Sequence, residues 1–221
     1  MGTGPDKFTA LRRRMVAGQL AARGIKDERV LAAMEKVPRH LFTAPEYAEM
    51  AYDDMALPLG DGQTISQPYM VAVMTELLAL RGGEKVLEVG TGSGYQAAVL
   101  AELAAEVYTV EYRPELAERA KRKLDGLGYG NIRSMAADGS AGWPEGAPYQ
   151  GILVTAAAPD VPPPLIEQLD EGGRLVIPLG SRGSQRLLMA VKRQGRLVKE
   201  YHTFCVFVPL LGQYGWPDSG E

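Results

Sequence analysis

The sequence predicts one α/β domain on a doubly wound, mainly parallel sheet, with a helical extension before it and antiparallel strands after it. Three observations lead to this prediction. Apolar strand-like segments alternate with helical segments between residues 68 and 180, glycines or acidic residues follow several of those strands, and residues 181–212 lose the helical periodicity. Strands that alternate with helices join through right-handed crossovers and pair in parallel, whereas strands joined by a tight turn pair antiparallel.

The bulk composition is that of an ordinary globular domain. The chain has 221 residues, of which 46% are hydrophobic and 23% are charged, and its formal net charge is -3. This length suits a single domain, 1–221, which we divide into residues 1–67 (a helical extension and a long loop), 68–180 (the core) and 181–212 (the C-terminal strands). An acidic chain lacks the basic footprint of most nucleic-acid-binding proteins, and no segment approaches the length of a membrane span. We therefore expect a cytoplasmic protein without nucleic-acid or membrane partners.

Two helices are expected before the core. Residues 6 to about 22 carry apolar side chains at helical spacing, and residues 28–36 form a second helix that ends before Pro38. Residues 38–67 are rich in Pro, Asp and Gly and are expected to form a long ordered excursion. Long loops in compact domains often bind ligands, so this segment is a candidate for part of a site.

The elements of the core follow in regular order. Residues 68–80 read as a helix with Pro68 in its first turn and Gly82 as its stop signal. The expected strands are 85–90, 106–112, 131–138, 149–158 and 173–179, and the expected helices between them are 95–104, 114–125 and 164–170. Residues 185–193 and 196–210 form the antiparallel end around the turn Gln194-Gly195, and the tail that contains Trp216 is expected to fray.

A glycine-rich turn follows the first core strand. The segment VLEVGTGSGY places Gly90, Gly92 and Gly94 where the chain turns into a helix, so that the backbone can approach a ligand closely at the helix N-terminus. A dinucleotide-binding turn requires the spacing GxGxxG, but Tyr95 stands where that third glycine would be. The spacing GxGxG therefore argues against a site for NAD or FAD, and a dehydrogenase is the weakest alternative.

Acidic residues follow the next two strands. Glu111 ends the second core strand, where a carboxylate can accept both hydroxyls of a ribose. Asp138, followed by Gly139, ends the third strand, where a carboxylate can accept a hydrogen bond from an adenine amino group. Because ligands bind at the carboxyl ends of strands in open α/β sheets, these residues predict a site for an adenosine-type ligand without a pyrophosphate. S-adenosylmethionine fits that description.

The segments VLEVGTGSGY, VYTVE and AADG resemble the nucleoside-binding motifs of class I S-adenosylmethionine-dependent methyltransferases. The longer segments AYDDMALPLGDGQTISQPYMVA, VTAAAP, GGRLVIPLG and FVPLLG narrow the resemblance to the protein-L-isoaspartate (D-aspartate) O-methyltransferase family. It extends from about residue 10 to residue 212. GQTISQP, residues 62–68, is its most specific part, because general methyltransferases lack it.

The resemblance implies a function and a set of site residues. The chain would be a protein repair enzyme that moves a methyl group from S-adenosylmethionine to the free carboxylate of L-isoaspartyl and D-aspartyl residues in age-damaged proteins and peptides. It would act as a monomer and leave S-adenosyl-L-homocysteine as the product. Residues 38–67 would include the active-site loop and residues 68–180 the cofactor-binding core. Ser66 would be the catalytic hydroxyl, and the cofactor-binding residues would be Thr64, Ile65, Glu88, Gly90, Thr91, Gly92, Gly94, Glu111, Asp138 and Gly139.

Ser66 also has a purely structural interpretation. It lies just before Pro68, so its side chain could cap the helix that begins there, and the two roles are compatible. The implied reaction needs neither a general base nor a metal, because a carboxylate of pKa about 4 is already ionised at neutral pH. The chain has only two histidines and no cluster of cysteine and histidine ligands, which agrees with a site without metal.

Many members of the family have GHGQTISQP, whereas Asp61 takes the place of the histidine here, either as a turn residue or as an added charge near an anionic substrate. Cys205, the only cysteine, lies in the apolar segment FCVFVPL and is expected to be a buried packing thiol. A class I methyltransferase for a small molecule, and a cofactor-binding module without catalysis, share the nucleoside motifs and stay open as alternatives.

Overall fold

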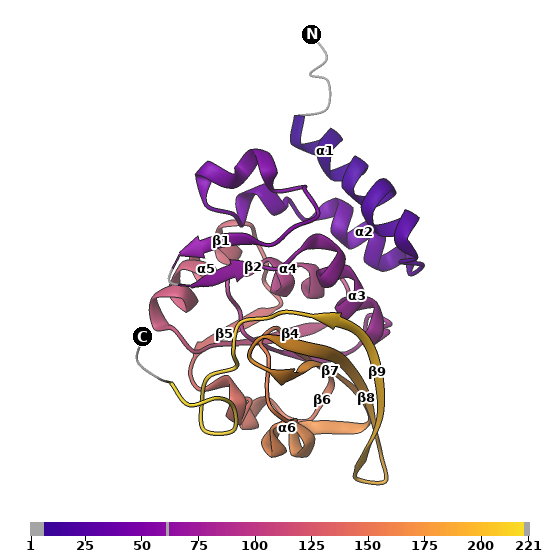
Figure 1. Ribbon diagram of the computed structural model, residues 1–221, viewed down its shortest axis with the longest axis vertical. Coiled ribbons are helices and arrows are strands. Elements are labelled where there is room, and N and C mark those ends of the chain that lie inside the picture. Colours follow the sequence, from indigo (N-terminus) through magenta and orange to yellow (C-terminus); the bar gives the residue numbers. More distant parts are fainter. Residues whose placement is uncertain (1–6, 61, 219–221) are drawn as a thin grey trace.

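Seven strands form one sheet in the order β5-β4-β3-β6-β7-β8-β9 in the computed structural model, which describes residues 7–60 and 62–218 (Figure 1). The strands are β3 (Lys85–Val89), β4 (Glu106–Glu111), β5 (Ile132–Ala136), β6 (Tyr149–Val154), β7 (Leu169–Ser181), β8 (Ser184–Arg193) and β9 (Arg196–Cys205). The strands from β5 to β7 pair in parallel, and β7, β8 and β9 pair antiparallel. The predicted α/β fold with a doubly wound, mainly parallel sheet and antiparallel C-terminal strands is therefore confirmed.

The sheet has an apolar core on each face because its strands are buried on both sides. Val86 and Leu87 illustrate this, since adjacent residues of a strand point to opposite faces and these two belong to different clusters of buried side chains. Helices α3 (Pro68–Leu78), α4 (Tyr95–Ala101) and α5 (Pro114–Gly126) contribute to the first cluster, and α6 (Pro163–Gln168) contributes Leu165 to the second. Such continuous apolar strands are typical of parallel sheets covered by helices.

The chain reverses its direction across the sheet at β3. From β3 it proceeds through β4 to β5 at one edge, then returns to β6 on the other side of β3. Strand ends on either side of such a reversal diverge, because the connecting helices leave toward opposite faces. The fold therefore opens a crevice at the carboxyl end of β3, where the glycine-rich turn lies.

The N-terminal extension packs on the helices of the first face. Helix α1 (Lys7–Met15) continues through a π-helical turn (Val16–Leu20) and a 3₁₀ turn (Ala21–Arg23), which together cover the range expected for one helix. Helix α2 (Glu28–Lys36) has the predicted bounds and contacts α3 and α4. Asp27 caps it by accepting hydrogen bonds from the backbone N–H groups of residues 29 and 30.

The excursion after α2 is ordered, as expected. It consists of two 3₁₀ helices (Arg39–Leu41 and Pro45–Met50) and a hairpin of two short strands, β1 (Leu57–Gly60) and β2 (Gln63–Ile65). In Figure 1 the hairpin lies above the carboxyl ends of the core strands, between the N-terminal helices and the sheet. The segment that directly precedes the core in sequence therefore covers the crevice.

Two local predictions are wrong. Helix α3 ends at Leu78, and Ala79 rather than Gly82 adopts the left-handed conformation that terminates it, with φ of 49°. The tail does not fray as far as residue 218, because the indole Nε1 of Trp216 donates to the carbonyl of Ala157 at 3.1 Å and its backbone N–H donates to Leu210 at 2.7 Å. Tertiary contacts outweigh the local signals at both places.

No helix among the described residues is long and apolar enough to cross a membrane.

Candidate active site

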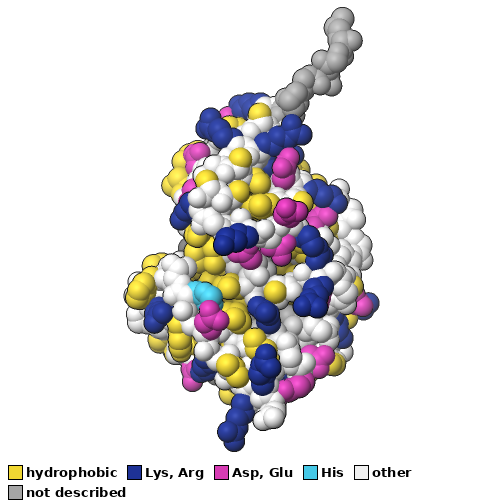
Figure 2. Space-filling view, turned by 90° about the vertical axis from the view of Figure 1, so that its right-hand side faces the viewer, with side chains coloured by type: hydrophobic (Ala, Val, Ile, Leu, Met, Phe, Trp, Pro, Cys, Tyr) yellow, Lys and Arg dark blue, Asp and Glu magenta, His cyan; other side chains and the backbone are white. Residues whose placement is uncertain are grey.

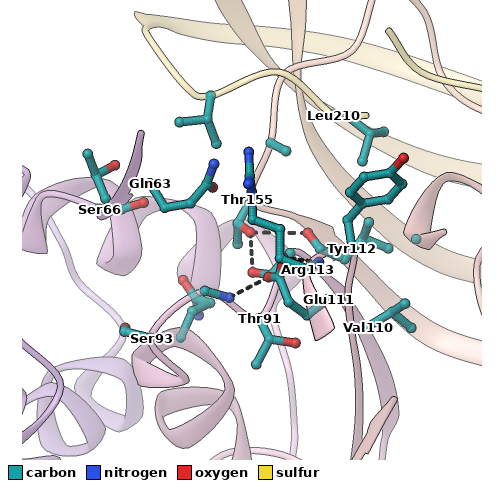
Figure 3. Close-up of a pocket in the computed structure, with 18 of the residues that line it drawn as sticks. Gln63, Ser66, Thr91, Ser93, Val110, Glu111, Tyr112, Arg113, Thr155 and Leu210 are labelled. Carbon is teal, nitrogen blue, oxygen red and sulfur yellow. Dashed lines mark hydrogen bonds between the residues drawn. The ribbon is translucent and has the colours of Figure 1, made fainter. Parts of the chain in front are cut away.

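A cavity of about 810 Å³, here called the first cavity, lies at the carboxyl ends of β3 and β4. The hairpin β1–β2 forms one side and the C-terminal segment 208–211 another, so residues from three distant parts of the chain meet there. Figure 3 shows Gln63 and Ser66 on one side of it and Tyr112 and Leu210 on the other. Its place at the reversal of strand order is the usual ligand-binding position of an open α/β sheet.

The glycine-rich turn forms the floor of the first cavity. Gly90 has φ of 100°, and a Cβ atom there would lie 2.3 Å from Oγ1 of Thr155, which donates to the carbonyl of Gly90 at 2.6 Å. Gly94, with φ of 87°, is the N-cap of α4. Gly92, with φ of 54°, has no atom within 4 Å of its Cβ position, so the backbone between the two is open to a ligand.

Glu111 and Thr91 face the first cavity from the same edge. One carboxylate oxygen of Glu111 accepts from the backbone N–H of Gly92 at 2.9 Å, and the other accepts from that of Arg113 at 3.0 Å. A carboxylate has about four acceptor positions, so at least two remain for hydroxyl donors. The Glu111 carboxylate is therefore fixed in direction and still able to bind a diol.

Glu88 lies behind this wall and does not line the first cavity. Its side chain is fully buried, and one oxygen accepts from Oγ1 of Thr109 at 2.5 Å. The Thr109 hydroxyl also lies 2.6 Å from that of Thr91, which does line the cavity. Burial raises the pKa of Glu88 to about 8, so this carboxyl group is largely uncharged at neutral pH. Among the predicted cofactor residues, Glu88 thus reaches the cavity only through two threonine hydroxyls.

Asp138 is also displaced from the cavity surface, whereas Gly139 lines it. One oxygen of Asp138 accepts from the N–H and Oγ of Ser140 at 2.9 and 2.6 Å, and the other accepts from the backbone N–H of Gln213 at 2.7 Å. The carboxylate therefore fastens the C-terminal tail beside the cavity. A Cβ atom at Gly139 would lie 2.6 Å from Val89, so only glycine fits between the strand and the cavity.

The segment GQTISQP forms the side of the first cavity opposite Tyr112. Ile65 is buried and pairs with Leu57 across the hairpin, while Thr64 pairs with Pro58 and is exposed. All three of Thr64, Ile65 and Ser66 line the cavity. The alternation of a strand fixes Ile65 in the core and leaves its neighbours to face the ligand space.

Ser66 does not cap helix α3, the structural role that its position in the sequence also allowed. The N-cap residue is Gln67, and its side chain makes no capping hydrogen bond. Asp54 supplies this function instead, because its Oδ1 accepts from the N–H of Tyr69 at 3.3 Å and its Oδ2 accepts from the Gln67 amide at 2.8 Å. Arg23 forms an ion pair with the same carboxylate. The Ser66 hydroxyl is consequently not needed for the helix.

Ser66 instead lies between two cavities. A second cavity of about 880 Å³ adjoins the first, and the two share Thr64, Ser66, Thr155 and Val208 as lining residues. The other residues that line the second cavity are Asp54, Met55, Ala56, Gln67, Met70, Phe204, Cys205, Val206 and Phe207. A ligand in each cavity would therefore meet the other at the Ser66 side chain.

Several lining residues did not follow from residue chemistry alone. Thr155 and Ala156 belong to the segment VTAAAP, and Val208 to Leu211 belong to FVPLLG, which the sequence offered only as family motifs. Gln63 precedes the predicted residues of the hairpin, and Arg113 follows Glu111 by two positions. Gln63 belongs to the family motif GQTISQP, whereas the position of Arg113 carries no signal in the sequence, so the tertiary structure alone brings Arg113 to the cavity.

Cys205 and Asp61 are the two remaining positions that the sequence singled out. Cys205 is half-buried at the edge of the second cavity rather than fully buried, and desolvation raises the pKa of its thiol to about 11, which disfavours the reactive thiolate. Asp61 lies outside the described residues. Within the described part of the chain, no three His, Cys, Asp or Glu side chains gather in a way that would hold a metal ion.

Comparison with known proteins relates this chain to one enzyme family. A family model described as protein-L-isoaspartate(D-aspartate) O-methyltransferase matches residues 11–215. Protein-L-isoaspartate O-methyltransferases from Methanoculleus marisnigri and Geobacter metallireducens are each 56% identical to this chain. The first match covers 93% of this chain and 93% of the relative, and the second covers 95% and 97%.

Two solved structures share the fold. A protein-L-isoaspartate O-methyltransferase superposes with a TM-score of 0.84 at 33% identity, covering 92% of this chain and 67% of the other. A structure from Plasmodium falciparum, described as a complex with S-adenosyl-L-homocysteine, superposes with a TM-score of 0.79 at 24% identity and covers 90% of this chain and 98% of the other. The likeness extends over nearly the whole chain.

Proposed function

This chain belongs to the protein-L-isoaspartate (D-aspartate) O-methyltransferase family, and from that premise we propose that Ser66 orients the carboxylate that receives the methyl group. The protein is a repair methyltransferase that uses S-adenosylmethionine and acts on the free carboxylate of L-isoaspartyl and D-aspartyl residues in damaged proteins and peptides. The observation that carries the proposal is the position of Ser66 on the boundary of the two cavities.

The first cavity is the proposed binding site for S-adenosylmethionine. Its residues fit that ligand, because Glu111 retains acceptor positions for ribose hydroxyls and the backbone at Gly92 is open to close approach. The other proposed contacts are Thr64, Ile65, Thr91, Gly90 and Gly139. Gly94 does not line the first cavity, and it is proposed to support the site by turning the chain into α4. Glu88 is proposed to act through Thr109 and Thr91, and Asp138 to hold the tail segment beside the adenosine, since neither lines the cavity.

Methyl transfer to a carboxylate requires no proton transfer by the protein. S-adenosylmethionine, when bound, supplies an electrophilic methyl group on a positively charged sulfur. The acceptor is a carboxylate of pKa about 4, which is already ionised and needs no general base. The residues of the chain therefore contribute mainly by holding acceptor and donor in line and by excluding water, which is the usual source of rate enhancement in such transfers.

Ser66 is proposed to donate a hydrogen bond to the acceptor carboxylate. Within the described residues, the structure records no hydrogen bond made by its hydroxyl, so the donor is available to a ligand. Gln67, which follows Ser66, donates from its side-chain amide to the Asp54 carboxylate at 2.8 Å and to the Asp54 carbonyl at 2.9 Å. Ile65, which precedes Ser66, pairs with Leu57 across the hairpin. This support fixes the hydroxyl without using it.

Three broader expectations remain proposals. We propose that residues 1–221 act as one methyltransferase domain, an interpretation supported by the contacts of α2 with α3 and α4 and by the position of the N-terminal hairpin on the first cavity. The protein is proposed to act as a monomer without nucleic-acid partners, consistent with its net charge of -3, and light scattering after gel filtration would measure its mass. A cytoplasmic location is likewise proposed, and cell fractionation would test it.

The experiment that tests the function uses two synthetic peptides that differ only in one linkage, aspartyl or isoaspartyl. Each is incubated with methyl-labelled S-adenosylmethionine, and base-labile methyl ester is counted. We expect label on the isoaspartyl peptide alone. Binding of S-adenosyl-L-homocysteine without label on either peptide would contradict the function and favour a cofactor-binding module or a methyltransferase with another acceptor.

A further inference from the structure

The second cavity is lined mainly by apolar side chains, although it adjoins a site for a charged acceptor. Eight of its residues are Met55, Ala56, Met70, Phe204, Cys205, Val206, Phe207 and Val208. Its polar residues are Thr64, Ser66, Gln67, Thr155 and Asp54, and three of these also line the first cavity. Three of the five polar residues therefore lie where the acceptor carboxylate would lie, and apart from Asp54 and Gln67 the remaining lining residues are apolar.

Three of the apolar residues are unusually exposed. Phe204 and Val206 are each 74% exposed, and Met55 is 44% exposed. Isolated apolar residues are common on protein surfaces, but these three border a single cavity. On the face that Figure 2 shows, hydrophobic side chains gather toward the left-hand edge, around a histidine. A group that covers Phe204 and Val206 would remove a large apolar area from water.

The ring of Phe204 is held in place although it is exposed. The Arg186 guanidinium lies 5.6 Å from its centroid and 5.2 Å from that of Tyr201, and Arg186 also donates to the Tyr201 carbonyl at 3.4 Å. A cation over an aromatic face restrains the ring without covering it fully. Phe204 therefore presents a preorganised apolar surface at the cavity.

The charges around the second cavity do not favour a charged occupant. Among the described residues, Asp54 is the one charged residue that lines it, and its carboxylate already binds Arg23, Gln67 and the N–H of Tyr69. No lysine or arginine is among the lining residues. A basic side chain would thus find only a carboxylate that is already paired, and an acidic side chain would approach a like charge.

The occupant follows from the continuity of the two cavities. The isoaspartyl residue must place its carboxylate at Ser66, and the residues beside it in an extended peptide lie about 3.3 Å further along the chain per residue. They therefore enter the second cavity directly. We propose that Phe204 and Val206, supported by Met55, form a specificity surface for a large apolar side chain next to the isoaspartyl residue. This inference rests on the proposed function and adds a preference among its substrates.

The test compares isoaspartyl peptides that are identical except for one neighbour of the isoaspartyl residue. Leucine, serine or glutamate is placed on its amino side in one series and on its carboxyl side in another, and kcat/KM is measured for each. In at least one series we expect leucine to exceed serine roughly tenfold, which corresponds to partial burial of a leucine side chain. Glutamate should be the poorest neighbour in that series.

Variants assign the preference to the proposed residues. In the double variant Phe204→Ser, Val206→Ser, the ratio of leucine to serine should fall to within about twofold of one, mainly through KM. The matched control is Tyr201→Ser, which removes an exposed aromatic residue from the same strand that also contacts Arg186 but does not line the cavity. It should keep the wild-type ratio. Far-ultraviolet circular dichroism checks that each variant is folded.

Each outcome has a definite meaning. Equal kcat/KM for all neighbours in the wild-type protein, with methyl ester still formed, overturns the specificity surface and leaves the proposed function standing. An unchanged preference in the folded double variant also overturns it. Absence of ester on every isoaspartyl peptide overturns the proposed function and the inference together.

Discussion

The first and second cavities are built in different ways, although Ser66 lines both. Backbone groups form the floor of the first cavity, where Gly90 and Gly92 turn the chain and two backbone N–H groups fix Glu111. Side chains dominate the wall of the second, where Phe204 and Val206 stand exposed. A wall made of backbone tolerates little change, because a single added Cβ atom displaces it. A wall made of side chains changes gradually with the size of the side chain. Substitutions should therefore act sharply in the first cavity and gradually in the second.

The largest effect is expected from Gly90→Ala. The new methyl group would lie 2.3 Å from Oγ1 of Thr155 at φ of 100°, a region that alanine rarely adopts. Both effects should displace the turn and weaken binding of S-adenosyl-L-homocysteine at least ~100-fold, about 3 kcal/mol. Isothermal titration calorimetry measures this affinity.

Gly195→Ala is the matched control for this change. Gly195 also has a positive φ, of 73°, but it lies in the β8–β9 turn and has no atom within 4 Å of its Cβ position. It should lower stability by about 1 kcal/mol and leave ligand affinity within a factor of about two. Equal affinity in Gly90→Ala and in the wild type would show that the turn does not form the ligand wall.

Ser66→Ala tests the boundary between the cavities. The acceptor carboxylate loses negative charge as it takes the methyl group, so Ser66 is expected to act by positioning this nucleophile. Misplacement of a reacting group can cost about 10²-fold, so we expect kcat/KM for an isoaspartyl peptide to fall about 100-fold. Affinity for S-adenosyl-L-homocysteine should change by less than about threefold, because the backbone of the first cavity is unaffected. Ser184→Ala, at an exposed strand end, is the control. Wild-type kcat/KM in the folded Ser66 variant would remove Ser66 from the mechanism.

Glu88 provides a pH-dependent test of the layer behind the first cavity. Burial raises its pKa in the folded protein to about 8, above the ordinary value of 4.5. Folding therefore favours the protonated form, and the stability that this confers is present at acid pH and is lost as pH rises from about 4.5 toward 8. Relative to Glu88→Gln, the ligand-free wild type should lose on the order of 2 kcal/mol between pH 5 and pH 8.

Thermal unfolding of both proteins at the two pH values measures this difference. At pH 5 the side chain at this position is uncharged in both folded proteins, the wild type and Glu88→Gln. The difference in Tm at pH 5 is therefore the reference for the difference at pH 8. A parallel pH dependence of Tm for the two proteins would mean that Glu88 is not buried as an uncharged group.

The smallest effect is expected from Trp216→Ala in the tail. This removes the hydrogen bond to the Ala157 carbonyl and the contact with Arg182, whose guanidinium lies 5.4 Å from the indole ring. The backbone N–H of residue 216 still donates to the carbonyl of Leu210, which lines the first cavity, so this segment loses only the side-chain support of the indole. Affinity for S-adenosyl-L-homocysteine should fall about fivefold, close to 1 kcal/mol.

Tyr214→Ala is the control for the tail. Its backbone N–H donates to Oγ of Ser140 at 3.0 Å, and that bond survives the substitution. A smaller change than in Trp216→Ala is therefore expected. Equal losses in the two variants would show that the tail acts as a general cover rather than through the Trp216 contacts.

The sequence alone determined the fold and most of the first cavity. Alternating apolar segments specify buried parallel strands, and residues at their carboxyl ends must gather at one edge, so Gly90, Gly92, Glu111 and Gly139 could be predicted as neighbours. Each lies within a few residues of a strand end, and local spacing therefore carries the information. The family motifs added the hairpin residues, including Ser66.

Only the tertiary structure decided which side chains reach the ligand space and what borders it. Asp138 and Glu88 occupy predicted strand positions, but the tail and two threonines separate them from the first cavity. The second cavity joins residues 54–70 to residues 204–208, and no local pattern records that contact. Packing between distant segments depends on the volume and direction of every intervening side chain, so a one-dimensional pattern predicts the edge of the sheet but not the walls that close over it.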